Sequence, residues 1–448
     1  MVIGSSQLQK KSVEMKTKNK FTRNILSNYL AFLLLLMINS SKVSASSADE
    51  SVPYTVVSGD TIIQLVKRFL MPPYNVEELL KTNKIDNPDI IHEGSVLLFP
   101  RMALRHTPSY AEIIQVSCKS EIIVRNKVLA KGDMLVEGDH VDVPSDCSIR
   151  MVLEDGSIVA LPSGGQLKID KIRENVLESG PMLEMQISHG RVEANVNRGT
   201  NRTAPFQINT PTIAMGVRGT KFRVGHSEKN NNSSLEVMSG SVAIATLSNP
   251  AEGEKLVEGG RGVMVDAQGF TLADEALLPS PNLQVTRMNQ RRWLLNIDQS
   301  SGTTKVWKRS SSLATFTDMP ISKPVAKYEY WVDEPDENAI FYELLGESEA
   351  GLRGKVARYG ICKSNNKTCN VIFHSIFPPT TPIHIRLDRV DSEDPFILEH
   401  TLDISTNNGL FVITGLPAGD YEWVIRQPNN ILEESGAFKL LSYNGSPP

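Results

Sequence analysis

The sequence lacks the short patterns by which several classes of enzyme are recognised. Its 448 residues include eight histidines but no His-Glu-x-x-His motif, no Gly-x-Ser-x-Gly turn and no glycine-rich phosphate loop followed by lysine. These absences argue against a metallohydrolase, a serine hydrolase and a nucleotide-binding enzyme. A glycosidase with two catalytic carboxylates leaves no such pattern and stays open, because any two acidic side chains can converge in the folded chain. No cleft-forming insertion is recognisable, so we expect no enzyme, no cofactor and no bound metal.

Long apolar runs are missing too, with one short exception near the start. A membrane-spanning helix needs roughly twenty apolar residues, and the run from Tyr29 to Ile38 has about ten. Lysines and an arginine precede this run, and the small residues Val43-Ser44-Ala45 follow it. We therefore predict a signal peptide over residues 1–45, cut near Ala45, rather than a membrane span. No cysteine directly follows the run, so a lipid anchor is not predicted.

Positive charge is scarce after this leader. Residues 1–45 hold seven Lys/Arg and one acidic residue, a net charge of +6, so a total of −4 leaves −10 for the remainder. A chain this acidic is poorly suited to the phosphate backbone of a nucleic acid. We expect an exported protein of the periplasm or cell envelope with no nucleic-acid partner, no transmembrane segment after cleavage, and exposure at the cell surface left open.

Cysteine is rare, with four residues in 448. Their spacing fits neither a zinc site nor a Cys-x-x-Cys redox pair. In an exported protein, four cysteines are consistent with two disulfides. We expect Cys362 to pair with Cys369 across a short polar loop, and Cys118 to pair with Cys147 between neighbouring strand-like segments. Free buried thiols are the alternative.

The most informative stretch runs from Tyr54 to Pro100. Tyr54-Thr55-Val56-Val57 predicts a strand, and Thr61 with Gln64 predicts a capped helix start. The helix has one apolar stripe, formed by Ile62, Leu65, Val66 and Phe69. Asn75 with Glu78 predicts a second capped helix, and Val96 to Phe99 a closing strand.

This stretch resembles a LysM domain, expected over residues 53–101 with a βααβ fold. The resemblance is carried by Tyr54-Thr55-Val56, Ser58-Gly59-Asp60-Thr61, Asn87-Pro88 and Leu98-Phe99-Pro100. It implies binding of N-acetylglucosamine-containing glycans, most often peptidoglycan, in a groove between the loops after the first strand and before the last. Main-chain groups would bind the N-acetyl amides, and isoleucines the acetyl methyls. The implied contact residues are Gly59, Asp60, Thr61, Ile62, Asn87, Pro88, Asp89, Ile90 and Ile91. The alternative is that Asp60 and Thr61 only cap a helix and Ile62 only packs.

After a short basic linker, Arg101 to Pro108, the sequence predicts an all-β domain over residues 111–270. Alternating apolar residues recur between turn residues, as in Leu183, Met185 and Ile187. Asp155-Gly156 predicts a two-residue turn, and both Gly190-Arg191-Val192 and Gly240-Ser241-Val242 predict strand starts. The run from Asn230 to Ser234 predicts a polar loop tip.

The same region is similar to the FecR domain, through five ordered motifs. They are Leu153-Glu154-Asp155-Gly156-Ser157, His189-Gly190-Arg191-Val192, Phe206-Gln207-Ile208-Asn209-Thr210-Pro211, Val217-Arg218-Gly219-Thr220-Lys221-Phe222 and Val237-Met238-Ser239-Gly240-Ser241-Val242. The resemblance implies a β-rich, solenoid-like envelope domain related to a periplasmic regulator of iron-citrate uptake. We interpret Arg218-Gly219-Thr220 as structural, with a ligand site as the alternative.

The remaining sequence predicts two further β units, at residues 279–358 and 371–443. In the second, Leu416-Pro417-Ala418-Gly419-Asp420-Tyr421 resembles the late strands of immunoglobulin-like or fibronectin-like sandwiches. The whole chain is thus expected to be multi-domain and mostly β. The leading hypothesis is a peptidoglycan-binding envelope protein whose β-rich part contacts an unidentified envelope protein. A signal-sensing component of FecR type and a surface adhesin are the alternatives.

Overall fold

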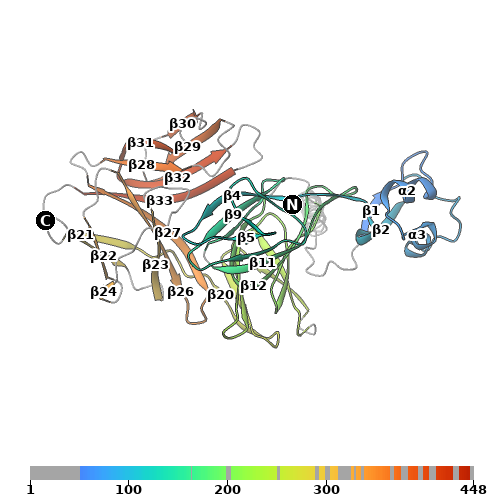
Figure 1. The fold of residues 1–448 in the computed structure, drawn as a ribbon, viewed down its shortest axis with the longest axis horizontal. Coiled ribbons are helices and arrows are strands. Elements are labelled where there is room, and N and C mark those ends of the chain that lie inside the picture. The colour runs from blue at the N-terminus through green and yellow to red at the C-terminus, as the bar shows by residue number, and fades with distance from the viewer. Residues whose placement is uncertain are drawn as a thin grey trace, which may run out of the picture. The chain divides into compact units, whose positions relative to one another are not determined.

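The structure is a computed structural model, and the fold it shows is mostly β (Figure 1). The residues that it describes are 51–162, 164–197, 203–249, 253–287, 292–297, 303–310, 324–326, 329–333, 338–363, 368–374, 382–391, 397–402, 410–426 and 433–443. The predicted signal peptide, residues 1–45, lies outside this set. In the part of the chain described, no helix has both the length and the apolar character needed to span a bilayer.

The first module has the expected βααβ order. Strands β1 (Ser51–Thr55) and β2 (Val96–Pro100) pair antiparallel around helices α2 (Ile62–Phe69) and α3 (Val76–Asn83). The Thr61 hydroxyl accepts the Gln64 N–H at 3.3 Å at the start of α2. At the start of α3, Asn75 and Glu78 form both bonds of a capping box. These local signals explain why the predicted helix starts are confirmed.

The predicted basic linker is wrong, because residues 101–108 are built into the fold. They form a 3₁₀ turn, η1 (Arg101–Ala103), and strand β3 (His106–Pro108), which pairs with β11. Leu104 is buried in the core of the first module, and Leu177 packs against that core. Arg101 Nε donates to Glu178 Oε1 at 2.9 Å, with both side chains buried. The apolar Leu104 and the ion pair explain why a basic stretch is not a solvated connection here.

The region after β3 consists of strands. They are β4 (Ala111–Ser117), β5 (Ile123–Val124), β6 (Lys127–Val128), β7 (Met134–Leu135), β8 (His140–Val143), β9 (Ser148–Leu153), β10 (Ile158–Leu161), β11 (Gly165–Asn175), β12 (Met182–Asn195), β13 (Phe206–Asn209), β14 (Ile213–Val217), β15 (Lys221–Ser227), β16 (Asn232–Ser239), β17 (Ser241–Thr246), β18 (Glu254–Glu258), β19 (Arg261–Val265) and β20 (Thr271–Ala276).

Strand β12 is the centre of this domain, because two arms of strands diverge from it. One arm has the order β13-β14-β17-β18, and the other has β15-β16-β19-β20. Inward-facing side chains of both arms, such as Val237 and Val242, belong to one hydrophobic core. The two arms therefore pack face to face, and β18 and β20 are their outermost strands.

Three local predictions in this domain need correction. The Leu153 N–H bonds the Ser157 carbonyl, so the turn between β9 and β10 has three residues rather than two, with Gly156 at a φ of 81°. Gly190 lies inside β12, where its φ of 91° allows the strand to bend without ending. Ser233, expected at a loop tip, is buried in β16 because hydroxyls bonded to it compensate for the burial of its own.

The C-terminal part forms one four-stranded, one seven-stranded and one two-stranded sheet. Their strands are β21 (Leu283–Arg287), β22 (Arg292–Ile297), β23 (Thr303–Ser310), β24 (Pro324–Ala326), β25 (Glu329–Asp333), β26 (Ile340–Glu347), β27 (Arg353–Lys363), β28 (Thr368–His374), β29 (Ile383–Arg389), β30 (Ile397–Leu402), β31 (Leu410–Pro417), β32 (Gly419–Arg426) and β33 (Glu433–Tyr443). The seven-stranded sheet, in the order β23-β26-β27-β33-β32-β29-β30, takes strands from both predicted units.

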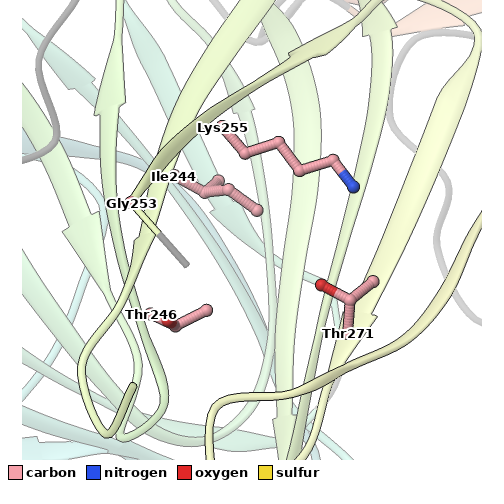
Figure 2. A pocket seen from close by; sticks show the side chains of 5 residues that line it. All are labelled: Ile244, Thr246, Gly253, Lys255 and Thr271. Atoms are coloured by element: carbon pink, nitrogen blue, oxygen red, sulfur yellow. The ribbon is translucent and has the colours of Figure 1, made fainter. Parts of the chain in front are cut away.

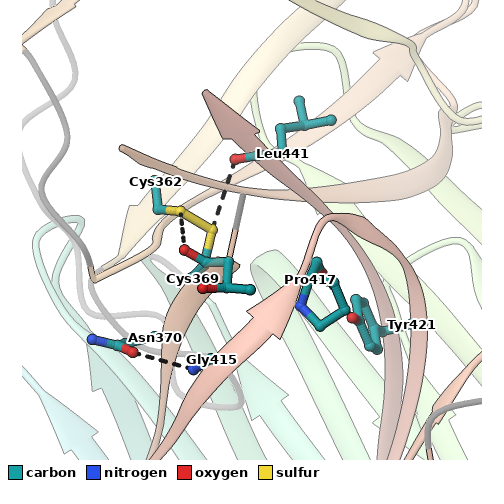
Figure 3. The surroundings of a disulfide bond; sticks show 8 residues. Cys362, Cys369, Asn370, Gly415, Pro417, Tyr421 and Leu441 are labelled. Carbon is teal, nitrogen blue, oxygen red and sulfur yellow. Dashed lines mark hydrogen bonds between the residues drawn. A yellow bond between two sulfur atoms is a disulfide. The ribbon is translucent and has the colours of Figure 1, made fainter. Parts of the chain in front are cut away.

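Both expected disulfides are confirmed. Cys118 pairs with Cys147, and Cys362 pairs with Cys369 between β27 and β28 (Figure 3). In the surroundings of the Cys362–Cys369 disulfide, the Tyr421 hydroxyl donates to the Pro417 carbonyl at 2.7 Å. A tyrosine that bonds back to the preceding corner is a feature of immunoglobulin-like sandwiches, and it matches the resemblance noted in the sequence.

Candidate glycan-binding loops

Two exposed loops of the first module leave its small sheet at the same end. Thr55, the last residue of β1, lies opposite Val96, the first residue of β2. Just beyond them, Val56 donates to the Ser95 carbonyl and accepts the Gly94 N–H, both at 2.9 Å. These main-chain hydrogen bonds therefore connect the loop of residues 57–61 to the loop that begins at Asn87, at the point where both loops leave the sheet. This arrangement brings together the two loops that the sequence predicted to form a groove.

The first loop is held in shape by Asp60. Its carboxylate accepts the Tyr54 hydroxyl at 2.8 Å and the Val57 N–H at 2.9 Å. The bond to Asp60 favours the protonated phenol and so raises the pKa of Tyr54. Gly59 is exposed at a φ of 90°, and Thr61 is exposed while capping α2. The Asp60 side chain thus has a structural role, and the exposed edge of this loop includes Gly59 and Thr61.

The isoleucines divide between the core and the surface. Ile62 is only 1% exposed and packs in the core, whereas its neighbour Ile63 is 57% exposed. In the second loop, Ile90 is 56% exposed and Ile91 packs partly against the core. The side chain of Ile62 therefore cannot hold an acetyl methyl in this arrangement. Ile63 was missed, although the helical stripe that starts at Ile62 already implies that the next residue faces outward.

The second loop is a compact turn that leaves its main chain at the surface. The Asn87 side-chain oxygen accepts the Asp89 N–H at 3.0 Å, and the Asn87 carbonyl accepts the Ile90 N–H at 3.2 Å. Asn87, Pro88 and Asp89 are all exposed. The two loops together present exposed main-chain groups and two isoleucines, which suits a neutral amide-bearing sugar better than a charged ligand.

In the larger β domain, the segment Arg218 to Thr220 has a structural role. Gly219 has a φ of 59°, and Thr220 is buried. The Thr220 hydroxyl lies 2.8 Å from the Ser241 carbonyl and 3.0 Å from the Arg218 carbonyl. The hydroxyl thus ties the bend before β15 to the start of β17, as the structural interpretation of the sequence proposed.

A serine and a histidine that no motif revealed also meet in this domain. His226 Nδ1 lies 2.9 Å from Ser233 Oγ, and the Thr212 hydroxyl donates to the same oxygen at 2.6 Å. Both residues are buried, and burial lowers the pKa of His226. No substrate can reach a serine enclosed in this way, so the cluster joins β15 to β16 and to the loop before β14. Among the described residues, no three His, Cys, Asp or Glu side chains gather as metal ligands would.

Two family models match the chain in the order expected. Residues 54–100 match the LysM domain, and residues 139–243 match FecR protein. The chain therefore contains a LysM domain followed by a FecR domain. Both are families of non-catalytic binding or regulatory modules, and they indicate a glycan ligand for the first and a protein partner for the second. Together with the two disulfides, they fit a protein of the envelope or periplasm.

No curated protein matches the chain. Among solved structures, two crystal structures described as an anti-sigma factor from Parabacteroides distasonis ATCC 8503, at 1.65 and 2.50 Å resolution, are 18% identical, with TM-scores of 0.26 and 0.25. These matches cover 31% of this chain and 59% of the anti-sigma factor chain. A chimeric titin Z1Z2 tandem is 14% identical over 36% of this chain and 99% of its own, with a TM-score of 0.13.

Proposed function

We propose that this is a non-enzymatic, exported envelope protein that its LysM domain holds on peptidoglycan, while the FecR domain and the C-terminal sheets contact a protein partner. The observation that carries the proposal is the LysM match over residues 54–100, with its two predicted glycan loops exposed and joined at one end of the module. The expected domain boundaries and the cleavage near Ala45 are part of the same proposal.

The loops would bind the N-acetyl group of an N-acetylglucosamine residue. Exposed main-chain groups around Gly59 and Asn87 can exchange hydrogen bonds with the amide, and Ile63 and Ile90 can cover the methyl group. Such a shallow contact buries little area, so a single module should bind weakly. Many glycan repeats on one sacculus, or a second wall contact, would compensate by raising the effective concentration.

Sedimentation with purified insoluble peptidoglycan tests this proposal in the full mature chain, from residue 46 onward. Ile63→Asp and Ile90→Asp should each reduce the bound fraction, because covering an isoleucine contributes about 1.5–3 kcal/mol and an aspartate there would be desolvated. Ile123→Asp, at an equally exposed isoleucine in β5, is the matched control and should sediment like the parent. Equal sedimentation of all four proteins would reject the tether.

Point variants test glycan binding more specifically than deletion of residues 51–101 does. The buried Leu104 and the Arg101–Glu178 pair belong to the module's surroundings, so the deletion would expose apolar surface. A truncated chain with exposed apolar surface could sediment with peptidoglycan without specific binding. The three aspartate variants change only exposed side chains and avoid this problem.

The FecR match favours a second candidate, a periplasmic signal-sensing component. In that role the domain would receive input from another envelope protein, and loss of the gene would change the transcription of a defined set of genes. Complementation with the Ile63→Asp chain separates the two candidates. A pure tether would lose its function with glycan binding, whereas a sensor that does not depend on the wall would restore transcription.

A further inference from the structure

In the described part of the FecR domain, each arm ends in a strand that has one neighbouring strand. Within the described residues, β18 pairs only with β17, and β20 pairs only with β19. The connection Glu258 to Arg261 passes from one arm to the other, because β19 pairs with β16 rather than with β18. The edge strands therefore lie on the two sides of a mouth between the arms. An edge strand presents unpaired N–H and C=O groups to which an extended chain can bind.

The mouth contains a pocket of about 260 Å³ (Figure 2). It is lined by Ile244, Thr246, Gly253, Lys255 and Thr271, which come from both arms. Lys255 Nζ donates to Asp274 Oδ2 at 2.5 Å, and Arg261 bonds the same carboxylate. The salt bridge spans from β18 to β20 and leaves the pocket beside it open. A strand added along β18 could place alternate side chains in this pocket.

The other face of β18 has an unusual row of side chains. Glu254, Leu256 and Glu258 alternate along it and are all exposed, and the Leu256 side chain is 54% exposed. The described segment 253–276 has five acidic and two basic residues, a net charge of −3. Directly opposed charged pairs across strands are stabilising only when their signs differ. The row therefore matches a strand with the order basic, any residue, apolar, any residue, basic, in either direction.

The second edge is less suited to pairing. The register between β19 and β20 shifts at Leu272, which is left as the extra residue of a β-bulge and is also 54% exposed. A bulge twists an edge strand away from regular pairing. β18, by contrast, pairs with β17 over Glu254 to Glu258 without a register shift. The two edges thus differ in regularity while presenting equally exposed leucines.

We propose that β18 is the docking edge of the FecR domain and that its occupant is an extended segment of a protein partner with that basic and apolar alternation. The segment would add a strand to the first arm by main-chain bonds, with specificity from Glu254, Leu256 and Glu258. The inference rests on the proposed function in one respect: it assumes that the FecR domain, and not the LysM domain, contacts a protein.

The test uses the full mature chain and the synthetic peptide acetyl-Thr-Lys-Val-Val-Val-Lys-Thr-amide, with glutamates in place of the two lysines as the control peptide. We expect fluorescence anisotropy to show at least 10-fold tighter binding of the lysine peptide. The double variant Glu254→Lys/Glu258→Lys should reverse this preference, which a merely misfolded protein cannot do. Hydrogen exchange should slow at the amides of residues 254–258.

Leucine variants decide which edge is used. Leu256→Lys should weaken the lysine peptide about 10-fold, whereas the matched variant Leu272→Lys should bind like the parent. Absent binding, retained preference in the charge-reversed variant, or protection at β20 instead of β18 would each overturn the proposal. So would a dimer of the unliganded chain that Leu256→Lys dissociates, because the edge would then serve a second copy. Leu256→Lys should still sediment with peptidoglycan, so failure here is distinct from failure of the tether.

Discussion

Replacing Glu236 by glutamine should destabilise the FecR domain more than any exposed charge change. Glu236 is fully buried in β16 and accepts two bonds from Arg191 Nη1, at 2.5 and 2.7 Å. Arg223 lies 3.4 Å from the same carboxylate, and the Arg353 N–H donates to it at 3.1 Å. Removing one member of a buried ion pair costs about 3–5 kcal/mol, because the remaining charge is left without compensation.

Glutamine keeps a hydrogen-bond acceptor for Arg353, so we expect Glu236→Gln near the lower limit, about 3 kcal/mol. For a domain of this size, such a loss corresponds to a fall in Tm of about 6–12 °C. Urea unfolding at neutral pH, followed by hydrogen exchange in β16, measures it. Glu184→Gln is the matched control, because Glu184 pairs with Lys171 at 2.6 Å where both side chains are partly exposed. Its cost should stay below about 1 kcal/mol.

The pH dependence gives a second check on Glu236. Burial alone would raise its pKa, but Arg191 and Arg223 outweigh burial and hold the pKa below the ordinary value of 4.5. A carboxyl whose pKa is lowered in the folded state stabilises the folded protein at pH values above its unfolded pKa. This contribution to stability is lost as the pH falls through the folded pKa. The difference between the parent and Glu236→Gln should therefore be constant near neutrality and shrink below pH 4.5. A loss no larger than that of Glu184→Gln, or one unchanged by acid, would refute the reasoning.

Three further predictions concern stability. Gly190→Ala should lower the free energy of unfolding by at least about 2 kcal/mol, because the added Cβ would lie 2.5 Å from a backbone atom of β11. Gly253→Ala, whose Cβ would meet open space, should lower it by about 1 kcal/mol, as measured by urea unfolding. Replacing Cys118 and Cys147 by alanine should cost about 3.6 kcal/mol and replacing Cys362 and Cys369 about 2.4 kcal/mol, since the loops close over 29 and 7 residues. Burial raises the pKa of Tyr421 to about 12, so its contribution to stability should be complete below pH 10 and fall as the pH rises toward 12. Tyr421→Phe should lower the free energy of unfolding by about 1 kcal/mol and remove a phenol that ionises at about pH 12 in an alkaline absorbance titration.

Local patterns predicted the elements that depend on neighbouring residues. Thr61 and Asn75 begin helices because their side chains bond main-chain N–H groups three residues ahead. β17 begins at Ser241, directly after Gly240, close to where the alternation predicted a strand start. The pairing of Cys362 with Cys369 followed from the short loop between them, and that of Cys118 with Cys147 from the strand-like segments on which they lie. In the candidate site, the two glycan loops stay a prediction. Ile62 was expected to contact the ligand, but it is buried and its neighbour Ile63 is exposed, because the position of each residue around the helix was not considered.

Contacts between distant residues could not be predicted in this way. Glu236 meets Arg191 and Arg353, which lie 45 and 117 positions away, and nothing in a local window marks the three as a set. Ser233 resembles a loop residue until His226 and Thr212 are seen beside it. Likewise, Arg101 is one basic residue among several in its segment, and only the position of Glu178 shows that it is buried.

The position of β33 has a consequence for how this protein is made. The strand lies between β27 and β32 in the seven-stranded sheet, and its pairing with β27 joins Tyr359 to Lys439 in parallel. Without it, β23-β26-β27 and β32-β29-β30 would be two separate ribbons. The sheet can therefore assemble only after residues 433–443 have been synthesised, and such long-range pairing is slow. A premature stop codon before Glu433 would leave the two ribbons without the strand that joins them.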